Sequence, residues 1–148
     1  MCKGEAVKTD DKILNLLKDA SRRLIALQKE VLSEMKIKLS HYKVLTVLAL
    51  SGEIMQTELS EICGIDKPAT SRLVGEMSRE DFVKTTMKED NKKSIYVSLT
   101  FLGKQIAQSI KEKICAIEHK YFKKLNEAKK EKLYELLTEV LSKEESDA

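Results

Sequence analysis

Apolar residues recur at intervals of three and four along most of the chain, which is the period of a helix that is buried on one face. The first such stripe begins at Ile13 and ends at Met35, so we predict a long helix over residues 11–35. Four further apolar residues fall outside that stripe: Leu14, Leu16, Ile25 and Leu32. A helix with apolar residues on two sides has a second surface to bury, and we expect that surface to contact another subunit.

Two shorter helical segments follow, each with a start and a stop signal. Ser40 is a suitable N-cap for the first of them, and Gly52 is placed to end it. The second opens at Gln56 or Thr57 and stops at Gly64. Its inward-facing residues are expected to be Leu59 and Ile62.

A fourth helix begins directly after the tight turn at Gly64. Asp66 is a good N-cap, and Pro68 is tolerated within the first turn of a helix. The residues that follow the helical period and are expected to be buried are Thr70, Leu73, Val74 and Met77. The opposite face carries small, hydroxylic or cationic residues, namely Lys67, Ala69, Ser71, Arg72 and Gly75.

After Asp81 the pattern changes from the period of a helix to that of short strands. FVKTTM and SIYVSL are rich in β-branched and aromatic residues, and KEDNKK between them is polar and turn-forming, which predicts a hairpin with a charged tip. The helical period returns from Leu102, is interrupted at Asn126 and then continues in a last helix. We therefore predict a mainly α fold with a small β-hairpin, in the order four helices, hairpin, two helices.

Composition agrees with one mainly helical unit and excludes several classes of protein. A chain of 148 residues with 5% aromatic residues, five Gly and one Pro is long enough for one sizeable core, and we treat residues 1–148 as one unit. Its three cysteines form no CxxC pair and lie at no metal-ligand spacing, so we predict no disulfide, metal or cofactor and a reducing, cytoplasmic location. No apolar run approaches the roughly 18 residues of a membrane span, so no membrane partner is expected.

Charge by itself does not decide the function. The formal net charge of +3 is modest, and residues 36–100 carry ten basic against nine acidic side chains. The positive excess lies in residues 101–125, with six basic and two acidic residues, whereas residues 126–148 are acidic. A partner has to be inferred from the arrangement of particular residues instead.

Two short helices joined by a tight turn, with small and polar residues on the outer face of the second, are typical of a helix-turn-helix that enters the major groove of double-stranded DNA. Arg72 can donate two hydrogen bonds to a guanine edge, and Ser71 can reach a base or a phosphate. The helix start and the lysines of the hairpin supply phosphate contacts. The predicted DNA-binding residues are Gln56, Thr57, Lys67, Pro68, Ala69, Ser71, Arg72, Lys88, Lys92 and Lys93.

Three segments of the chain resemble the MarR family, the multiple-antibiotic-resistance regulators: LSHYKVLTVLAL, QTELSEICGIDKPATSRLVGEM, and VSLTFLG, which ends at Gly103. The resemblance implies a winged helix-turn-helix repressor that binds a pseudo-palindromic operator as a homodimer. It implies dimerisation helices over residues 11–35 and 102–145 and a DNA-binding lobe over residues 36–101. It also implies release by a small aromatic or apolar effector, with polar contacts from Arg22, Arg23 or Tyr42.

The chain departs from the family's pattern in two places, the wing and the end of the recognition helix. The wing of the family usually has an Asp followed by two Arg, whereas this chain has Asn91, Lys92 and Lys93. Lysine keeps the charge but lacks the planar fork of arginine, so we expect the wing to contribute charge more than sequence reading. The family's usual Gly after the recognition helix is Asp81 here, a residue type that adopts the left-handed conformation at some cost.

Competing interpretations remain at this point. With two His and no catalytic triad, phosphate-binding loop or metal-spaced cluster, the chain is not expected to be an enzyme. The alternative function is a winged-helix module that binds protein or RNA, because a fold does not fix a function. His41 and His119 are expected at the surface or at helix ends, and Cys63 and Cys115 are expected to be buried as small apolar residues.

Overall fold

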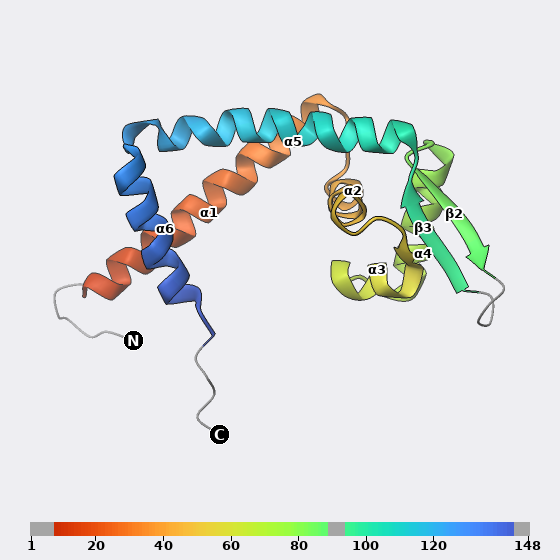
Figure 1. Ribbon diagram of the computed structural model, residues 1–148, viewed down its shortest axis with the longest axis horizontal. Helices are drawn as coiled ribbons and strands as arrows, with labels where there is room; N and C mark the ends of the chain where they lie inside the picture. The colour runs from red at the N-terminus through yellow and green to blue at the C-terminus, as the bar shows by residue number, and fades with distance from the viewer. Residues whose placement is uncertain (1–7, 89–93, 144–148) are drawn as a thin grey trace, which may run out of the picture. The chain divides into compact units, whose positions relative to one another are not determined.

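The computed structural model describes residues 8–88 and 94–143, and within these ranges it is mainly helical with one small sheet (Figure 1). The elements in chain order are α1 (Thr9–Glu34), α2 (Leu39–Ser51), β1 (Ile54–Met55), α3 (Gln56–Cys63), α4 (Lys67–Arg79), β2 (Val83–Lys88), β3 (Ser94–Leu99), α5 (Phe101–Tyr121), the 3-10 turn η1 (Phe122–Lys124) and α6 (Glu127–Leu141). The predicted fold class, a mainly α winged helix-turn-helix, is confirmed. None of the helices in the described ranges combines the length and the apolar character needed to cross a membrane.

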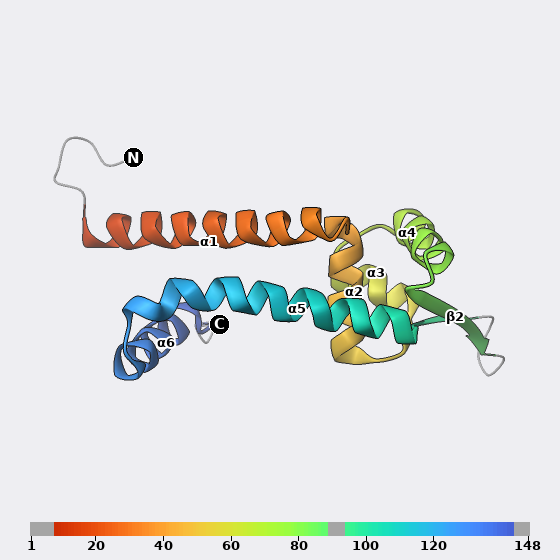
Figure 2. The same cartoon turned by 90° about the horizontal axis from the view of Figure 1, so that it is seen from above.

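The chain forms two compact units, residues 1–114 and residues 115–148. The first unit holds α1 to α4, the sheet and the first two thirds of α5. Its core gathers large apolar side chains from nearly every element, among them Val31, Leu45, Leu48, Leu59, Met77, Val97 and Ile110. Figure 2 shows α2, α3 and α4, which supply many of these side chains, gathered beside the start of α5.

The connection between α1 and α2 is tighter than the sequence suggested. Lys36 adopts a left-handed conformation, and the Ile37 amide donates to the Leu32 carbonyl, which ends α1. The helix α2 then begins at Leu39 with Lys38 in the N-cap position and no side-chain cap. The prediction that Ser40 is the N-cap is therefore wrong, because after the turn at Lys36 the helix starts two residues earlier.

Three antiparallel strands make up the sheet, in the order β1, β3, β2. The predicted hairpin is confirmed, with Val83 opposite Leu99 and Lys88 opposite Ser94. The short strand β1 was not predicted; it pairs Ile54 with Val97 and so fastens the start of α3 to the hairpin. The tip of the hairpin, residues 89–93, lies outside the described residues.

The link between α4 and β2 depends on Asp81. This residue has a φ of 62°, as expected for a position where the left-handed conformation is required. The Thr100 hydroxyl donates to the Asp81 carbonyl at 2.5 Å, and the Thr100 amide donates to the Phe82 carbonyl at 3.1 Å. Both ends of the hairpin are thereby tied together just before α5 begins.

The second unit contains the end of α5, η1 and α6. Asn126, where the helical pattern was predicted to break, is the N-cap of α6 and accepts a hydrogen bond from the Lys129 amide at 2.9 Å. No residue of α6 is buried within the described chain. Its large exposed apolar and aromatic side chains are Tyr134, Leu136, Val140 and Leu141.

Candidate nucleic-acid interface

The turn between α3 and α4 is fixed by hydrogen bonds between the end of α3 and the backbone of the turn itself. Gly64 has a φ of 64° and ends α3 in the left-handed conformation, as predicted. The buried Ser60 hydroxyl donates to the Ile65 carbonyl at 2.5 Å, and the Ile65 amide donates to the Ser60 carbonyl at 3.1 Å. These bonds set the angle at which α4 leaves α3.

The helix α3 docks through a different face from the one predicted. Leu59 and Ser60 are buried, whereas Ile62 is 60% exposed, so the prediction that Ile62 faces inward is wrong. The buried face of this eight-residue helix is defined by positions 59 and 60. Ile62 is two residues further along, which turns its side chain away from that face. Gln56 is its first residue, and the Glu58 carboxylate accepts a hydrogen bond from the Met55 amide at 3.1 Å.

The helix α4 has the cap and the buried face that the sequence predicted. The Asp66 carboxylate accepts a hydrogen bond from the Ala69 amide at 2.7 Å, and the Thr70 hydroxyl donates to the Asp66 carbonyl at 2.9 Å. The buried residues of α4 are Thr70, Leu73, Val74 and Met77, all four as expected. Since these residues occupy one side of the helix, the other side is left for a partner.

Five of the predicted DNA-binding residues line one surface hollow of about 340 Å³ at the N-terminal ends of α3 and α4: Gln56, Thr57, Lys67, Pro68 and Ser71. The hollow therefore joins two segments that are about ten residues apart in the sequence. It offers amide and hydroxyl groups and one ammonium, which are the groups that bind phosphate oxygens in protein–DNA complexes. Neither Lys67 nor Arg72 is in an ion pair with any acidic side chain of the described residues.

The exposed side of α4 continues beyond this hollow. Ala69 is half-buried and Arg72 is exposed, one turn further along the helix than Pro68. Arg79 is also exposed and lies seven residues, or two turns, after Arg72. We did not select Arg79 from the sequence, although its spacing of seven from Arg72 places both guanidinium groups on the same side of α4.

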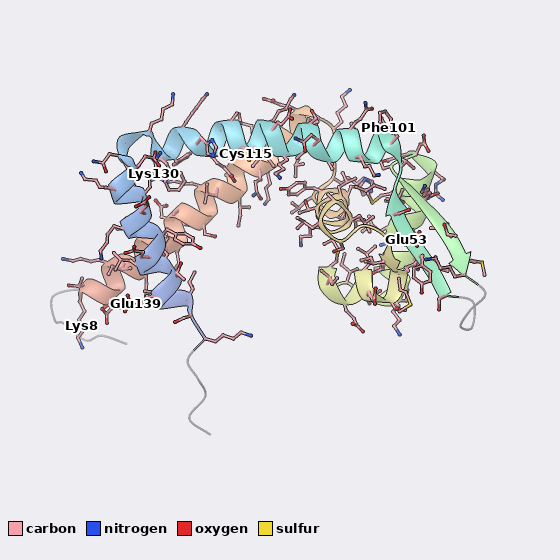
Figure 3. All side chains as sticks on the ribbon, viewed as in Figure 1. Lys8, Glu53, Phe101, Cys115, Lys130 and Glu139 are labelled. Atoms are coloured by element: carbon pink, nitrogen blue, oxygen red, sulfur yellow. The ribbon has the colours of Figure 1, made fainter. Side chains whose placement is uncertain are left out.

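Lys88, the one of the three predicted DNA-binding lysines of the hairpin that the structure describes, has partners within the chain. The Lys88 ammonium lies 2.5 Å from a carboxylate oxygen of Glu53, which Figure 3 labels just before β1. It also lies 4.2 Å from the centre of the Tyr96 ring, a cation–π arrangement. Lys92 and Lys93 lie outside the described residues, so their predicted role is untested.

His41 occupies a position that the sequence reading missed. Its side chain is 2% exposed, so the expected surface position is wrong, although His41 does lie at a helix end, in the first turn of α2. His41 lies on the buried stripe of α2, four and seven residues before Leu45 and Leu48, and that spacing is a signal that we did not use. The imidazole faces two carboxylates, those of Glu76 in α4 and of Glu80, the C-cap residue of that helix.

Glu53 and Glu76, like Glu80, are engaged with cationic or imidazole groups. Glu53 pairs with Lys88, and Glu76 lies 3.3 Å from His41 Nε2 and 3.5 Å from the Lys38 ammonium. The hydrogen bond with His41, followed by the charge of Lys38, lowers the pKa of the Glu76 carboxyl. Stabilisation from ionised Glu76 is therefore fully present above the ordinary glutamate pKa and is lost as the pH falls through the lowered one.

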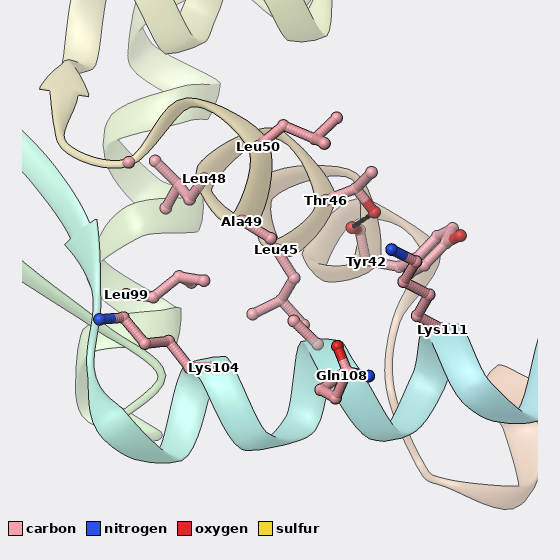
Figure 4. A pocket seen from close by; sticks show the side chains of 12 residues that line it. Tyr42, Leu45, Thr46, Leu48, Ala49, Leu50, Leu99, Lys104, Gln108 and Lys111 are labelled. Carbon is pink, nitrogen blue, oxygen red and sulfur yellow. Dashed lines mark hydrogen bonds between the residues drawn. The ribbon is translucent and has the colours of Figure 1, made fainter.

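A second cavity, of about 660 Å³, lies between α2 and the first half of α5 (Figure 4). Leu45, Leu48 and Leu99 give it an apolar wall, and Lys104 and Lys111 of α5 give it two cations. The remaining lining residues are Tyr42, Thr46, Ala49, Leu50, Gly52, Ala107 and Gln108. Tyr42, expected from the family resemblance as an effector contact, is thus at the cavity, whereas neither Arg22 nor Arg23 lines it: both pair with Asp19 on the exposed side of α1.

In a comparison of sequences, residues 36–94 match the MarR family. Among curated proteins, the chain is 23% identical over 96 residues to YwaE of Bacillus subtilis (strain 168), an HTH-type transcriptional regulator. That match covers 65% of this chain and 56% of YwaE, so the chain matches only about half the length of this relative. The name of this relative describes a transcriptional regulator and not an enzyme.

Solved structures with the same fold extend the likeness to nearly the whole chain. A mutant of MarR from E. coli superposes with a TM-score of 0.76 at 21% identity, covering 94% of this chain and all of that one. NadR, solved in complex with 4-hydroxyphenylacetate, superposes with a TM-score of 0.69 at 17% identity, covering 97% of this chain and 98% of NadR. At these identities the structural likeness establishes the fold.

Proposed function

We propose that the chain, whose residues 36–94 match the MarR family, is a sequence-specific, DNA-binding transcriptional repressor. It acts as a homodimer on a pseudo-palindromic operator, with one recognition helix α4 in the major groove of each half-site. A protein of this function works on cytoplasmic DNA.

The observation that carries this proposal is the surface formed by the starts of α3 and α4. Gln56, Thr57 and Lys67 line a hollow with hydrogen-bond donors for phosphates, and this hollow fixes the register of the helix on the duplex. Arg72 is exposed beyond it, where a guanidinium can donate two bonds to a guanine edge. Ala69 and Pro68 are small enough for α4 to approach thymine methyl groups closely.

The wing adds charge next to this surface. Lys88 is held by Glu53 and Tyr96 and so has to exchange at least part of that pairing for a phosphate when DNA binds. Lys92 and Lys93 are proposed to lie against the backbone of the duplex, where they increase affinity for all sequences alike. Sequence preference then depends mainly on α4.

The helices outside the lobe are proposed to form the dimer. In α1 the side chains of Ile13, Leu14, Leu16 and Ile25 are exposed within one chain, and α6 exposes a second apolar set. Apolar faces of this extent on a helix favour burial against another subunit. A homodimer would place two copies of α4 at a fixed spacing, as a pseudo-palindrome requires.

An effector is proposed to bind the cavity between α2 and α5. Its apolar wall suits an aromatic ring, and Lys104 or Lys111 suits a carboxylate, so a small aromatic acid fits the lining. NadR was solved with such a compound, 4-hydroxyphenylacetate. The ligand releases DNA by favouring the dimer conformation whose α4 spacing does not match the operator.

Selection of bound sequences from random DNA duplexes tests the DNA-reading proposal. We expect a palindromic motif to be enriched, with half-sites one helical turn apart, about 10 base pairs from centre to centre. Enrichment of no motif, with binding to RNA or a protein instead, would favour the alternative winged-helix interaction module. The effector is tested by adding aromatic carboxylates to the complex, where a Lys111→Met variant should lose sensitivity to the acids but not to uncharged analogues.

A further inference from the structure

Arg79 lies in the last turn of α4, and the function proposed above leaves it without a role. Its side chain is exposed and forms no ion pair with any acidic side chain of residues 8–88 and 94–143. A cation in the last turn of a helix interacts favourably with the helix dipole, and this is the role that Arg79 has without a partner. The direction of its side chain indicates a second role.

The Arg79 side chain folds back along α4 toward the start of the helix. Its Nη1 atom lies 3.9 Å from the point where a Cβ at position 75 would be, so the guanidinium lies over Gly75, one turn earlier. Gly75 is the one glycine of α4, and it has no side chain to occupy this space. The positive charge of Arg79 is therefore nearer the middle of α4 than its own Cα is.

Arg79 ends a row of residues at four-residue intervals, and such a row forms one ridge on the surface of a helix. The row consists of Lys67, Ser71, Gly75 and Arg79. Its first two members line the hollow at the starts of α3 and α4. The ridge therefore begins in the proposed phosphate-binding hollow with one cation and ends with another.

Two acidic side chains that flank Arg79 in the sequence contact α2 instead. Glu76 Oε2 lies 3.3 Å from His41 Nε2 and 3.5 Å from the Lys38 ammonium. Glu80 Oε2 lies 3.4 Å from His41 Nδ1. Because the contacts of both carboxylates are on the side of α2, neither forms an ion pair with the guanidinium of Arg79.

The spacing of the two cations along α4 matches the width of a major groove. Lys67 and Gly75, over which the guanidinium lies, are eight residues apart, which is about 12 Å along a helix. The major groove of B-DNA is about 12 Å wide, and the phosphates of the two strands border it. A helix that holds one strand at its start can therefore reach the other strand with a cation over Gly75.

We propose that Arg79 binds a phosphate of the DNA strand opposite the strand held by the hollow, so that α4 is fixed at both borders of the major groove. The proposal rests on the function proposed above, because it requires α4 to lie in a major groove. A contact between a guanidinium and a phosphate is charge-assisted and positions the helix without reading a base. Arg79 therefore increases the affinity for all operators alike, whereas sequence preference stays with Arg72.

Operators with one uncharged methylphosphonate linkage at a time locate such a contact. The operator is the motif selected from random duplexes, and the wild type should lose affinity at each phosphate that it binds. Arg79→Gln should bind the unmodified operator about tenfold more weakly, since hydrogen bonds to charged groups are of this order. It should lose nothing further at one phosphate of each half-site. Lys67→Gln should become insensitive at a phosphate of the opposite strand.

The control variants separate a phosphate contact from a stabilised helix end. Arg79→Lys keeps the charge at the end of α4 and should recover part of the affinity and the sensitivity at the same phosphate. Lys43→Gln removes one exposed positive charge from α2 and should keep the wild-type affinity and pattern. Circular dichroism checks that each variant is folded.

Three results would overturn the proposal. The first is a folded Arg79→Gln protein with wild-type affinity, and the second is one that stays sensitive at every phosphate to which the wild type responds. Either result leaves Arg79 with the helix dipole alone. The third is an Arg79 contact on the same strand as the Lys67 contact, because α4 would then be held at one border of the groove only.

The salt dependence of binding distinguishes failure of this proposal from failure of the proposed function. Each phosphate contact adds about 0.9 to the slope of log affinity against log salt, whatever the sequence of the duplex. If no motif is selected, sequence-specific reading fails, and Arg79→Gln should still lower this slope by about one per subunit on a duplex of arbitrary sequence. If a motif is selected and the slope is unchanged, only the role of Arg79 fails. Absence of binding to any duplex overturns both.

Discussion

At the scale of single residues, Arg72 is the side chain on which the proposed reading of DNA sequence most depends. It is exposed on α4, is in no ion pair with the described acidic groups and directly follows Ser71, which lines the hollow at the starts of α3 and α4. A bidentate bond to guanine accounts for about 1–3 kcal/mol of discrimination between bases. Its planar guanidinium cannot be replaced by a lysine without losing that geometry.

Arg72→Ala is therefore expected to lower operator affinity by about 1–3 kcal/mol and to relax preference at one base pair of each half-site. Lys92→Ala should weaken binding to all sequences alike and reduce its dependence on salt. Competition titrations with single-base operator variants measure both effects. Equal losses on every operator variant for Arg72→Ala would show that this residue contacts phosphate only.

The thiol of Cys63 is expected to react slowly with alkylating agents. Burial raises the pKa of this thiol, and the nearby charge of Lys43 offsets only part of that effect. Because the thiolate is the reacting form, a raised pKa lowers its fraction at neutral pH. In a protein with Cys2 and Cys115 changed to Ser, iodoacetamide at pH 7.5 should modify Cys63 more slowly than free cysteine. A faster reaction would contradict this and indicate an activated thiol.

The sequence predicted the role of a residue correctly where that role depends only on neighbours a few positions away. Asp66 could be identified as a cap because capping needs only a carboxylate three residues before the amide it binds. Arg72 followed from the helical period of its neighbours. The burial of His41 was missed because histidine is compatible with either surface or core, and its two carboxylate partners lie 35 and 39 residues further along the chain.

At the scale of elements, the junction between the wing and α5 depends on Gly103. A Cβ at this position would overlap the Phe82 carbonyl group, and it would also lie 3.3 Å from the Leu99 side chain. The Gly103 amide donates an ordinary hydrogen bond to the Thr100 hydroxyl at 3.0 Å. The glycine is therefore required by close approach of two backbones and not by its φ angle.

Gly103→Ala is expected to destabilise the protein by at least about 1–3 kcal/mol, because α5 has to move away from the backbone at Phe82. Urea unfolding followed by circular dichroism measures the loss. Gly75→Ala is the matched control, since a Cβ there meets only the flexible end of Arg79 at 3.9 Å. Within a helix this control should be neutral or stabilising. Equal stability of the two variants would contradict the proposed close contact.

Elements with a strong internal period were predictable, and elements formed by pairing at a distance were not. The helix α4 and the hairpin carry their own start and stop signals in the sequence. The strand β1 has two residues and exists only because Ile54 and Met55 pair with β3, about 40 residues later. Ile62 was misassigned because an eight-residue helix has too few positions to show which of its faces is buried.

At the scale of the whole molecule, the sequence predicted the helices and the hairpin of residues 36–101 but not which of their side chains meet in the fold. It indicated phosphate contacts for Gln56 and a base-reading face for Ser71 separately, and the fold brings both to one hollow. The cavity between α2 and α5 also depends on packing that no local pattern encodes. The proposed assembly into a dimer is a further level, and it makes a prediction of its own.

The exposed apolar side chains of α6 are expected to be buried by a second copy of the chain. Leu136 and Val140 are one helical turn apart, and Val140 is 66% exposed within a single chain. A carboxylate placed in such an interface loses its hydration without gaining a partner, so Val140→Glu should favour the monomer. Light scattering at micromolar concentration should then give a mass near 16.8 kDa in place of twice that value.

The same variant connects assembly to DNA binding. A monomer presents one α4 instead of two and loses the gain in affinity from binding both half-sites at once, which is typically about 10²-fold or more. Val140→Glu should therefore bind a single half-site as well as wild type does but lose its preference for the full palindrome. Ile62→Glu, which changes a similarly exposed apolar residue on α3, is the matched control for assembly and should remain a dimer. A folded Val140→Glu protein that stays dimeric and keeps that preference would place the subunit contact away from α6.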